Sequence, residues 1–159
     1  MIFVTVGTQL AFDRLVTAVD EWAGQATPLR VFAQVGPSNR SFRNLEYKSF
    51  VSPHEADKLF RNAEIVVSHA GMGSILTALK YRKPIVILPR RASLGEHRNE
   101  HQLATAKWLG GRSGVTVAWD VSELVGILER RSELSNGDII SDFASPELLT
   151  RLQIFISNA

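Results

Sequence analysis

Short apolar runs rich in β-branched residues recur along this 159-residue chain, and segments of helical periodicity separate them. The runs predict strands at 2–6, 29–35, 45–50, 63–69, 83–89 and 114–119. The segments between and after them predict helices at about 12–22, from Pro53 to about 60, 74–81, 97–109, 121–131 and 146–157. Strands joined by helices predict right-handed βαβ crossovers. The fold class is therefore α/β, with a Rossmann-like parallel sheet covered by helices on both faces.

The composition agrees with one globular domain that spans residues 1–159. Hydrophobic residues make up 45% and charged residues 21%, and the absence of cysteine excludes disulfides and cysteine-ligated zinc. The net charge of +2 favours anionic partners such as nucleotide phosphates, but the basic residues are scattered, so we expect no nucleic-acid partner. We expect neither a signal peptide at the start MIFVTVGTQ nor a membrane-spanning helix.

Two glycine-containing loops follow strands that we expect to lie side by side. In open parallel sheets a ligand binds at the carboxyl ends of the strands, where the strand order reverses. For the order 3-2-1-4-5-6, that place lies between the first and fourth strands. The loops there are GTQLAFD (7–13) and SHAGMGS (68–74), and both lead into helices. Two distant parts of the sequence are therefore expected to share one site.

Both loops have the composition of an anion site. Glycine lets the backbone approach a ligand closely, and free N–H groups at a helix start favour negative charge. The residues expected to bind a diphosphate in this way are Gly7, Thr8, Gly71, Met72, Gly73 and Ser74. The alternative is that the glycines only form tight turns and that Ser74 only caps its helix. Asp13 is more simply a helix cap than a ligand.

A dinucleotide-binding fold is a rival interpretation of the same glycines. The stretch GMGSIL has Gly71 and Gly73, but Leu76 occupies the third glycine position of the dinucleotide motif. The stretch also follows the fourth strand rather than the first. Arg90 and Arg91, after the next strand, resemble a reader of a ribose phosphate. The missing packing glycine makes this rival the weaker interpretation.

Residues 97–101, HRNEH, fit the H-x-x-E-H pattern of one class of zinc peptidases. That site needs the motif inside a helix and a later acidic ligand, whereas this motif falls near a helix start. A second interpretation is a solvated, charged helix start. The third uses Glu96, His101 and Gln102 to recognise hydroxyl groups, since Gln offers both a donor and an acceptor. Beside two phosphate loops, such groups favour a nucleotide-sugar site without a metal.

Four stretches carry a resemblance to a known family: VTVGTQLAFDRLV, FVSPHEADKLFRNAEIVVSHAGMGSILTAL, KPIVILPR and GEHRNEHQLATA. Together they resemble the C-terminal domain of glycosyltransferase family 28, over roughly residues 1 to 110. The short stand-alone members include the catalytic subunit of the dolichol-linked N-acetylglucosamine transferase and bacterial exopolysaccharide subunits. The resemblance implies one half of a GT-B enzyme, the half that binds a UDP-sugar.

The resemblance also implies roles for individual residues. Thr8 would lie near the diphosphate, and the backbone at Phe50 and Val51 would face the uracil. Gly71, Gly73 and Ser74 would form the phosphate-binding helix start, with His101 and Gln102 near the sugar. Many relatives hold the ribose with a Glu on the 74–81 helix, where this chain has Thr77, which can make only one such bond.

The implied reaction is an inverting transfer of a hexose from a UDP-sugar to a lipid-linked acceptor. The sugar is N-acetylglucosamine, glucuronic acid or similar, and the product belongs to a polysaccharide or glycolipid. Amide groups of both loops would stabilise the leaving UDP, so no metal or other cofactor is required. His69 is a candidate for the base, although a histidine at a strand end is about as often structural.

A partner is expected from the same resemblance. The acceptor half would be a separate membrane-associated subunit, which places this chain in the cytoplasm at the inner face of the membrane. The segment PELLTRLQIFISNA has an apolar stripe that either packs on its own domain or docks that partner: Leu148, Leu149, Leu152, Phe155 and Ile156. The alternative function is a non-catalytic module that binds a nucleotide-sugar or acts as a scaffold.

Overall fold

The computed structural model describes residues 1–25, 29–138 and 144–157. Six parallel strands form one sheet in the order β3-β2-β1-β4-β5-β6. The strands are β1 (Ile2–Thr5), β2 (Val31–Gln34), β3 (Glu46–Lys48), β4 (Ile65–His69), β5 (Ile85–Leu88) and β6 (Val115–Val117). The predicted fold class and strand order are confirmed. The order reverses between β1 and β4, as the site prediction requires.

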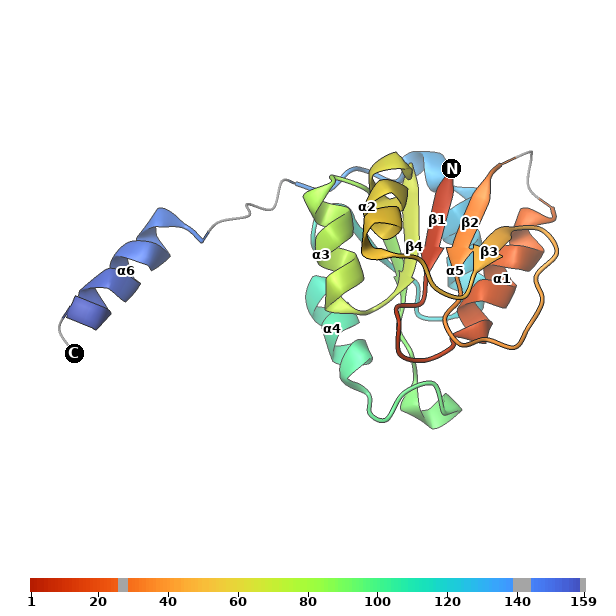
Figure 1. The fold of residues 1–159 in the computed structure, drawn as a ribbon, viewed down its shortest axis with the longest axis horizontal. Helices are drawn as coiled ribbons and strands as arrows, with labels where there is room; N and C mark the ends of the chain where they lie inside the picture. The colour runs from red at the N-terminus through yellow and green to blue at the C-terminus, as the bar shows by residue number, and fades with distance from the viewer. Residues whose placement is uncertain (26–28, 139–143, 158–159) are drawn as a thin grey trace.

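Helices cover both faces of this sheet (Figure 1). The helices are α1 (Asp13–Ala23), α2 (Pro53–Asn62), α3 (Met72–Lys80), α4 (His101–Leu109), α5 (Val121–Glu129) and α6 (Pro146–Ser157). Successive side chains of a strand point to opposite faces. Ile2 and Val4 of β1 therefore join the apolar cluster under α1 and α5, while Phe3 joins the cluster under α2, α3 and α4. Both faces of β1 are buried, which explains its uninterrupted apolar run.

Two predicted helix starts are displaced. α3 begins at Met72, two residues before the predicted start, with Gly71 as its N-cap. α4 begins at His101 rather than His97, because residues 96–100 form a series of bends after a short 3-10 turn at Ala92–Leu94. The polar segment 130–138 contains a second 3-10 turn (Arg131–Glu133) and then irregular chain to residue 138.

The last helix contains the predicted apolar stripe but none of its residues is buried. Leu148, Leu149 and Leu152 are each about half exposed, and Phe155 and Ile156 are more than two thirds exposed. Figure 1 shows α6 standing away from the sheet and its covering helices. In the structure as described, the stripe is therefore uncovered.

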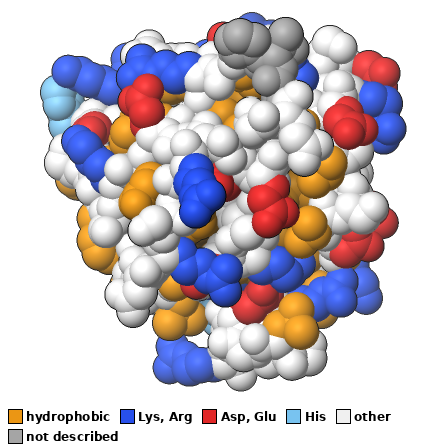
Figure 2. Space-filling model, turned by 90° about the vertical axis from the view of Figure 1, so that its right-hand side faces the viewer, with side chains coloured by type: hydrophobic (Ala, Val, Ile, Leu, Met, Phe, Trp, Pro, Cys, Tyr) orange, Lys and Arg blue, Asp and Glu red, His pale blue; other side chains and the backbone are white. Residues whose placement is uncertain are grey.

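The right-hand side of Figure 1 is a mixed polar surface. Figure 2 shows basic and acidic side chains interspersed there, with small apolar areas between them. Two ion pairs lie at the surface of α1 and the β2–β3 region: Arg30 lies 3.1 Å from Glu46, and Arg40 lies 3.4 Å from Asp13. In the parts of the chain that the structure describes, no helix is both long and apolar enough to cross a membrane.

Candidate functional site

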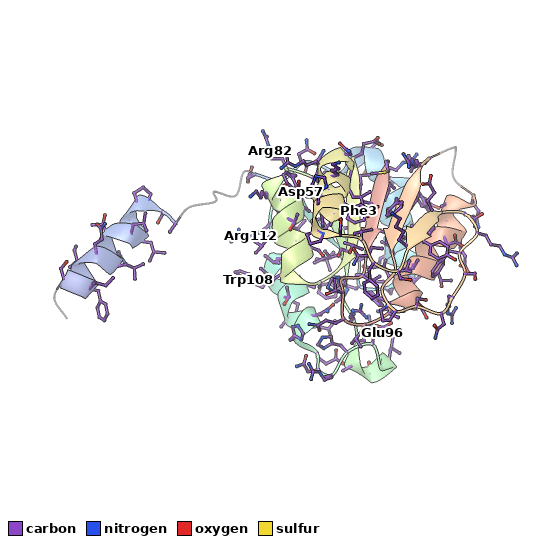
Figure 3. All side chains as sticks on the ribbon, viewed as in Figure 1. Phe3, Asp57, Arg82, Glu96, Trp108 and Arg112 are labelled. Atoms are coloured by element: carbon purple, nitrogen blue, oxygen red, sulfur yellow. The ribbon has the colours of Figure 1, made fainter. Side chains whose placement is uncertain are left out.

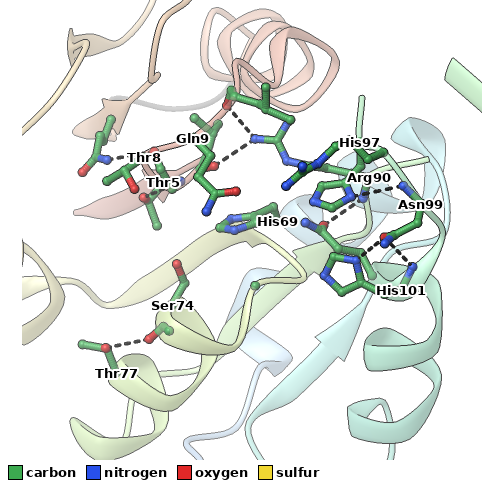
Figure 4. A pocket seen from close by; sticks show the side chains of 18 of the residues that line it. Thr5, Thr8, Gln9, His69, Ser74, Thr77, Arg90, His97, Asn99 and His101 are labelled. Atoms are coloured by element: carbon green, nitrogen blue, oxygen red, sulfur yellow. Dashed lines mark hydrogen bonds between the residues drawn. The ribbon is translucent and has the colours of Figure 1, made fainter. Parts of the chain in front are cut away.

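A cavity of about 810 Å³ opens at the carboxyl ends of the strands (Figure 4). Ligand pockets in proteins commonly have volumes of 300 to 1,000 Å³. The wall contains residues from both glycine loops, from the ends of β1 and β2, and from the segment before α4. Its members are Thr5, Val6, Gly7, Thr8, Gln9, Leu10, Gln34, Phe60, His69, Gly71, Gly73, Ser74, Thr77, Arg90, His97, Arg98, Asn99, His101 and Gln102. The two loops that we expected to share one site do so.

Residues 7–10 of the β1–α1 loop line this cavity. Gly7 has a φ of +77°, a conformation that glycine adopts at no steric cost. Its carbonyl accepts a hydrogen bond of 3.0 Å from Nε2 of Gln34. Within the described chain, no acceptor pairs with the N–H groups of residues 8–12. The loop therefore offers several free donors.

The start of α3 offers a second set of donors. The first turn of a helix leaves its N–H groups without partners inside the helix. The N-cap Gly71 has an extended backbone and no side chain to cap them, so the amides of Met72, Gly73 and Ser74 have no partner among the residues that the structure describes. A Cβ atom added at Gly73 would meet nothing within 4 Å. The space above this helix start is therefore open to a ligand.

His69 lies between the two loops. A Cβ atom added at Gly7 would come within 2.9 Å of Cε1 of His69, and one added at Gly71 would come within 2.1 Å of Nε2. Only glycine leaves room for the ring at these two positions. The hydroxyl of Ser68 donates to the carbonyl of Thr5, and its Oγ lies 3.2 Å from Nδ1 of His69. The imidazole ring therefore sets the spacing of the two amide loops.

The protonation of His69 does not suit a general base. Burial, and then the nearby positive charge of Arg90, lower the pKa of the His69 ring to about 4. An efficient base at neutral pH has a pKa close to 7, because a lower value makes the nitrogen a weak proton acceptor. We therefore favour the structural role for His69 over the catalytic role predicted for it.

The low pKa of His69 predicts an acid-sensitive stability. The ring in the unfolded chain binds a proton near pH 6.5, whereas the folded ring does so only near pH 4. The unfolded state thus binds more protons between these values, so stability is complete above pH 6.5 and falls as the pH drops towards 4. From pH 7 to pH 5 we expect a loss of about 2 kcal/mol in the free energy of unfolding.

Urea unfolding at the two pH values measures this loss, and His69→Gln is the comparison. The variant has no imidazole to protonate, so its stability should change by about 2 kcal/mol less over the same interval. An equal pH dependence of both proteins would contradict the buried, neutral state of the ring.

Glu96 is not part of the cavity wall. Its carboxylate accepts two hydrogen bonds from Arg14, of 2.6 and 2.8 Å, and one of 2.9 Å from the backbone N–H of Arg91. Its side chain is 12% exposed. Figure 3 places Glu96 at the carboxyl end of the sheet, below the strands. With its oxygens in use, Glu96 holds the β5–α4 loop, and its predicted role in sugar binding is not supported.

The two histidines of the H-x-x-E-H stretch line the cavity, but not as a helical pair. Residues 97–100 lie in bends, and only His101 belongs to α4. The carboxylate of Glu100 accepts from the backbone N–H of Ser93, so it is used within the loop. Nδ1 of His101 pairs with Oδ1 of Asn99 (Figure 4). Among the described residues, no group of three or more His, Asp or Glu side chains has the arrangement of a metal site.

Most of the other predicted residues line the cavity, and three do not. Gln102 is 3% exposed, and its Oε1 accepts a bond of 3.1 Å from the N–H of Arg90. The hydroxyl of Thr77 donates to the carbonyl of Gly73, which leaves it as an acceptor for a ligand. Phe50, Val51 and Met72 are outside the wall: Val51 packs against the core, and the other two are exposed.

Sequence reasoning missed Gln9, Gln34, Phe60, His97, Arg98 and Asn99 as cavity residues. Gln34 carried a usable signal, because it is a polar residue at the carboxyl end of a buried strand beside β1. Phe60 carried none, since its position on the apolar face of α2 predicts only a core residue.

The comparisons with known proteins agree with this geometry. The model of the glycosyltransferase family 28 C-terminal domain matches residues 1–122, which is most of the chain. The chain belongs to this family. Residues 1–122 include both glycine loops and the whole cavity wall.

One curated relative and two solved structures show how far the similarity extends. The UDP-N-acetylglucosamine transferase subunit ALG13 of Eremothecium gossypii is 37% identical over 90 residues, which are 56% of this chain and 43% of that protein. The glycotransferase of kitacinnamycin has a TM-score of 0.63 at 17% identity, covering 83% of this chain and 34% of its own. The solution structure of ALG13 has a TM-score of 0.59 at 17% identity, and the match covers 95% of this chain and 93% of that one. The two structures show the fold of one GT-B half, and the matched region is less than half of the first relative's length.

Proposed function

We propose that this chain is the donor-binding subunit of a two-component inverting glycosyltransferase that uses a UDP-sugar. The observation that carries the proposal is the convergence of two loops of free amides on one cavity. The wall contributes the cations Arg90 and Arg98 and, among the described residues, no carboxylate. Such a wall suits a diphosphate, because N–H dipoles and cations stabilise the anion and no like charge opposes it.

The proposed reaction is a single displacement at the anomeric carbon. The acceptor oxygen forms a bond to that carbon on one face while the bond to the UDP oxygen breaks on the other, which inverts the configuration. The electron pair of the broken bond goes to UDP, and the amides of the two loops stabilise its added charge without a metal. The acceptor proton goes to a base, which we place on the partner because the pKa of His69 makes it a weak base.

The donor sugar is the finer part of the proposal. The Eremothecium gossypii relative is named as a UDP-N-acetylglucosamine transferase subunit, which supports N-acetylglucosamine as the sugar. His101, Gln102 and Asn99 are polar groups at the cavity that match hydroxyl or amide partners on a sugar. The name of this relative gives no support to an exopolysaccharide product.

The partner and the acceptor are also proposed. The relative is named as a subunit, which supports a complex with a second chain. We propose that a membrane-associated subunit binds the lipid-linked acceptor and holds this chain at the cytoplasmic face of the membrane. The alternative is a non-catalytic module that binds the same donor. Transfer of labelled sugar by this chain with and without the partner distinguishes the two.

A calorimetric panel tests the donor class. We expect UDP and UDP-N-acetylglucosamine to bind, with GDP- and dTDP-sugars binding at least about tenfold more weakly, because base and sugar contacts add to the shared diphosphate contacts. EDTA should leave the affinity unchanged, because amide groups replace a metal at the phosphates. No heat with any nucleotide diphosphate would refute the proposed function. A strict requirement for a divalent cation would refute the amide mechanism alone.

A further inference from the structure

Arg90 follows β5 and is almost completely buried, with 2% exposure. Its guanidinium donates to carbonyl groups of the β1–α1 loop and of the β5–α4 loop (Figure 4). The distances are 2.9 Å to Val6, 2.7 Å to Leu10, 2.5 Å to Ala11 and 3.3 Å to Glu96. The ring of Phe12 stacks on the guanidinium, with 4.5 Å between Cζ and the ring centroid. One side chain thus fixes both ends of a loop that has no regular structure.

The direction of these bonds decides what the loop shows to the cavity. In a trans peptide the carbonyl and the following N–H point in opposite directions. Because the carbonyls of Val6 and Leu10 point at Arg90, the N–H groups of Gly7 and Ala11 point away from it. Gln34 has a similar effect one residue later. Its Nε2 donates to the carbonyl of Gly7, so the N–H of Thr8 points away from Gln34. The carbonyls of Val6, Gly7, Leu10 and Ala11 are therefore occupied by the protein. The N–H of Gly7 binds Oγ1 of Thr5, and among the described residues the N–H groups of residues 8–12 have no acceptor.

We propose that Arg90 is a positioning residue that orients the amides of the β1–α1 loop for the diphosphate. The proposal rests on the proposed function, because it concerns the same site. Arg90 acts through the loop rather than through a bond to the ligand. Oriented donors avoid the cost of ordering the loop when the ligand binds, and this raises affinity.

Only arginine suits this place. A guanidinium has five N–H donors in a planar fork, whereas the ammonium of lysine has three donors at one point. Burial lowers the pKa of Arg90 to about 10, and Glu96 opposes that change, so the group stays charged near neutral pH. The charge of Arg90 also makes the electrostatic potential of the cavity more positive, which favours an anionic ligand.

A second layer holds Arg90 itself. Arg14 binds the carboxylate of Glu96 and, at 3.1 Å, the carbonyl of Pro89 directly before Arg90. Oε1 of Gln102 accepts a hydrogen bond from the backbone N–H of Arg90. The β1–α1 loop and the β5–α4 loop therefore form one hydrogen-bonded unit. This arrangement couples a phosphate loop to the segment that carries His101 and Gln102.

Titration of UDP into the wild type, Arg90→Lys and Asp20→Asn tests the proposal. Lysine keeps the charge but cannot reach all of the carbonyls, so we expect UDP to bind about 10- to 100-fold more weakly. The NMR order parameters of the backbone amides of residues 7–12 should fall in the same variant, because the loop loses its anchor. Asp20 is the matched control, because this buried carboxylate accepts bonds from the N–H groups of Arg43 and Asn44, away from the cavity. Asp20→Asn should lose stability yet bind UDP like the wild type.

The outcomes separate the two levels of the proposal. If the wild type does not bind UDP, the proposed function fails. If Arg90→Lys binds UDP like the wild type, the positioning role fails, whatever the order parameters of residues 7–12. Should Arg90→Lys not fold, the wild type still provides a test, since its Arg90 Nη protons should give slowly exchanging NMR signals that UDP does not shift. Rapid exchange of these protons would overturn the proposal, and a large shift with UDP would make Arg90 a direct ligand instead.

Discussion

Gly73→Trp is expected to abolish UDP binding while the melting temperature stays close to that of the wild type. A Cβ atom at this position would meet no protein atom within 4 Å, so the fold can accept a side chain. That side chain would enter the cavity above the start of α3, where we place the diphosphate. We expect the affinity to fall by at least about 100-fold, because the indole excludes the ligand from the free amides. Calorimetry and thermal unfolding measure the two quantities.

Gly111→Trp is the control for this substitution. Gly111 also has no atom within 4 Å of an added Cβ, and it lies in the turn after α4, at the end of the helix opposite to His101. This variant should bind UDP normally. Normal binding by Gly73→Trp would remove the α3 start from the donor site. Gly71→Ala is a less clear test, because the methyl group would collide with His69 and disturb both loops.

The strand order and the meeting of the two loops were predictable from the sequence. The strands are short, β-branched and buried on both faces, and helices of regular period separate them. Handedness then leaves few topologies, and the carboxyl ends of β1 and β4 come together in the reversed order. This reasoning needs only the pattern of apolar residues and glycines. It therefore placed Gly7, Thr8, Gly71, Gly73 and Ser74 correctly at one cavity.

The partners of charged side chains were not predictable. Glu96 was expected to meet a sugar because it lies in a polar loop, but Arg14, 82 positions earlier, binds its carboxylate. Arg90 was considered only as a phosphate reader, yet its acceptors are carbonyls of a loop about 80 residues away. Such pairings depend on side-chain reach across two loops. The periodicity of apolar residues in the sequence does not predict which side chains meet in this way.

The burial and the charged neighbours of His69 were also not predictable from the sequence. Its place at the end of a strand beside two glycines is compatible with a base and with a packed ring. The choice depends on burial and on the nearby charge of Arg90, which lower the pKa of the ring. Both are properties of the folded chain. The start of α4 was misplaced for a similar local reason, since residues 96–100 bend where polar side chains bind backbone groups.

The second large effect is expected at α6, where Leu152→Asp with Phe155→Asp should abolish assembly with the proposed acceptor-binding subunit. The two side chains belong to one exposed stripe, and docking would bury them. A buried, unpaired carboxylate costs several kcal/mol, so two should lower the affinity by well over about 100-fold.

The cavity lies on other elements, so UDP binding by the double variant should be unchanged. Co-expression with the candidate partner followed by gel filtration measures the complex, and sugar transfer measures its activity. Thr150→Asp with Gln153→Asp adds the same charge outside the stripe and should leave assembly intact. A stripe that is buried only in the complex contributes nothing to the stability of the free chain. A lower melting temperature of the isolated stripe variant would therefore show that the stripe packs on its own domain instead.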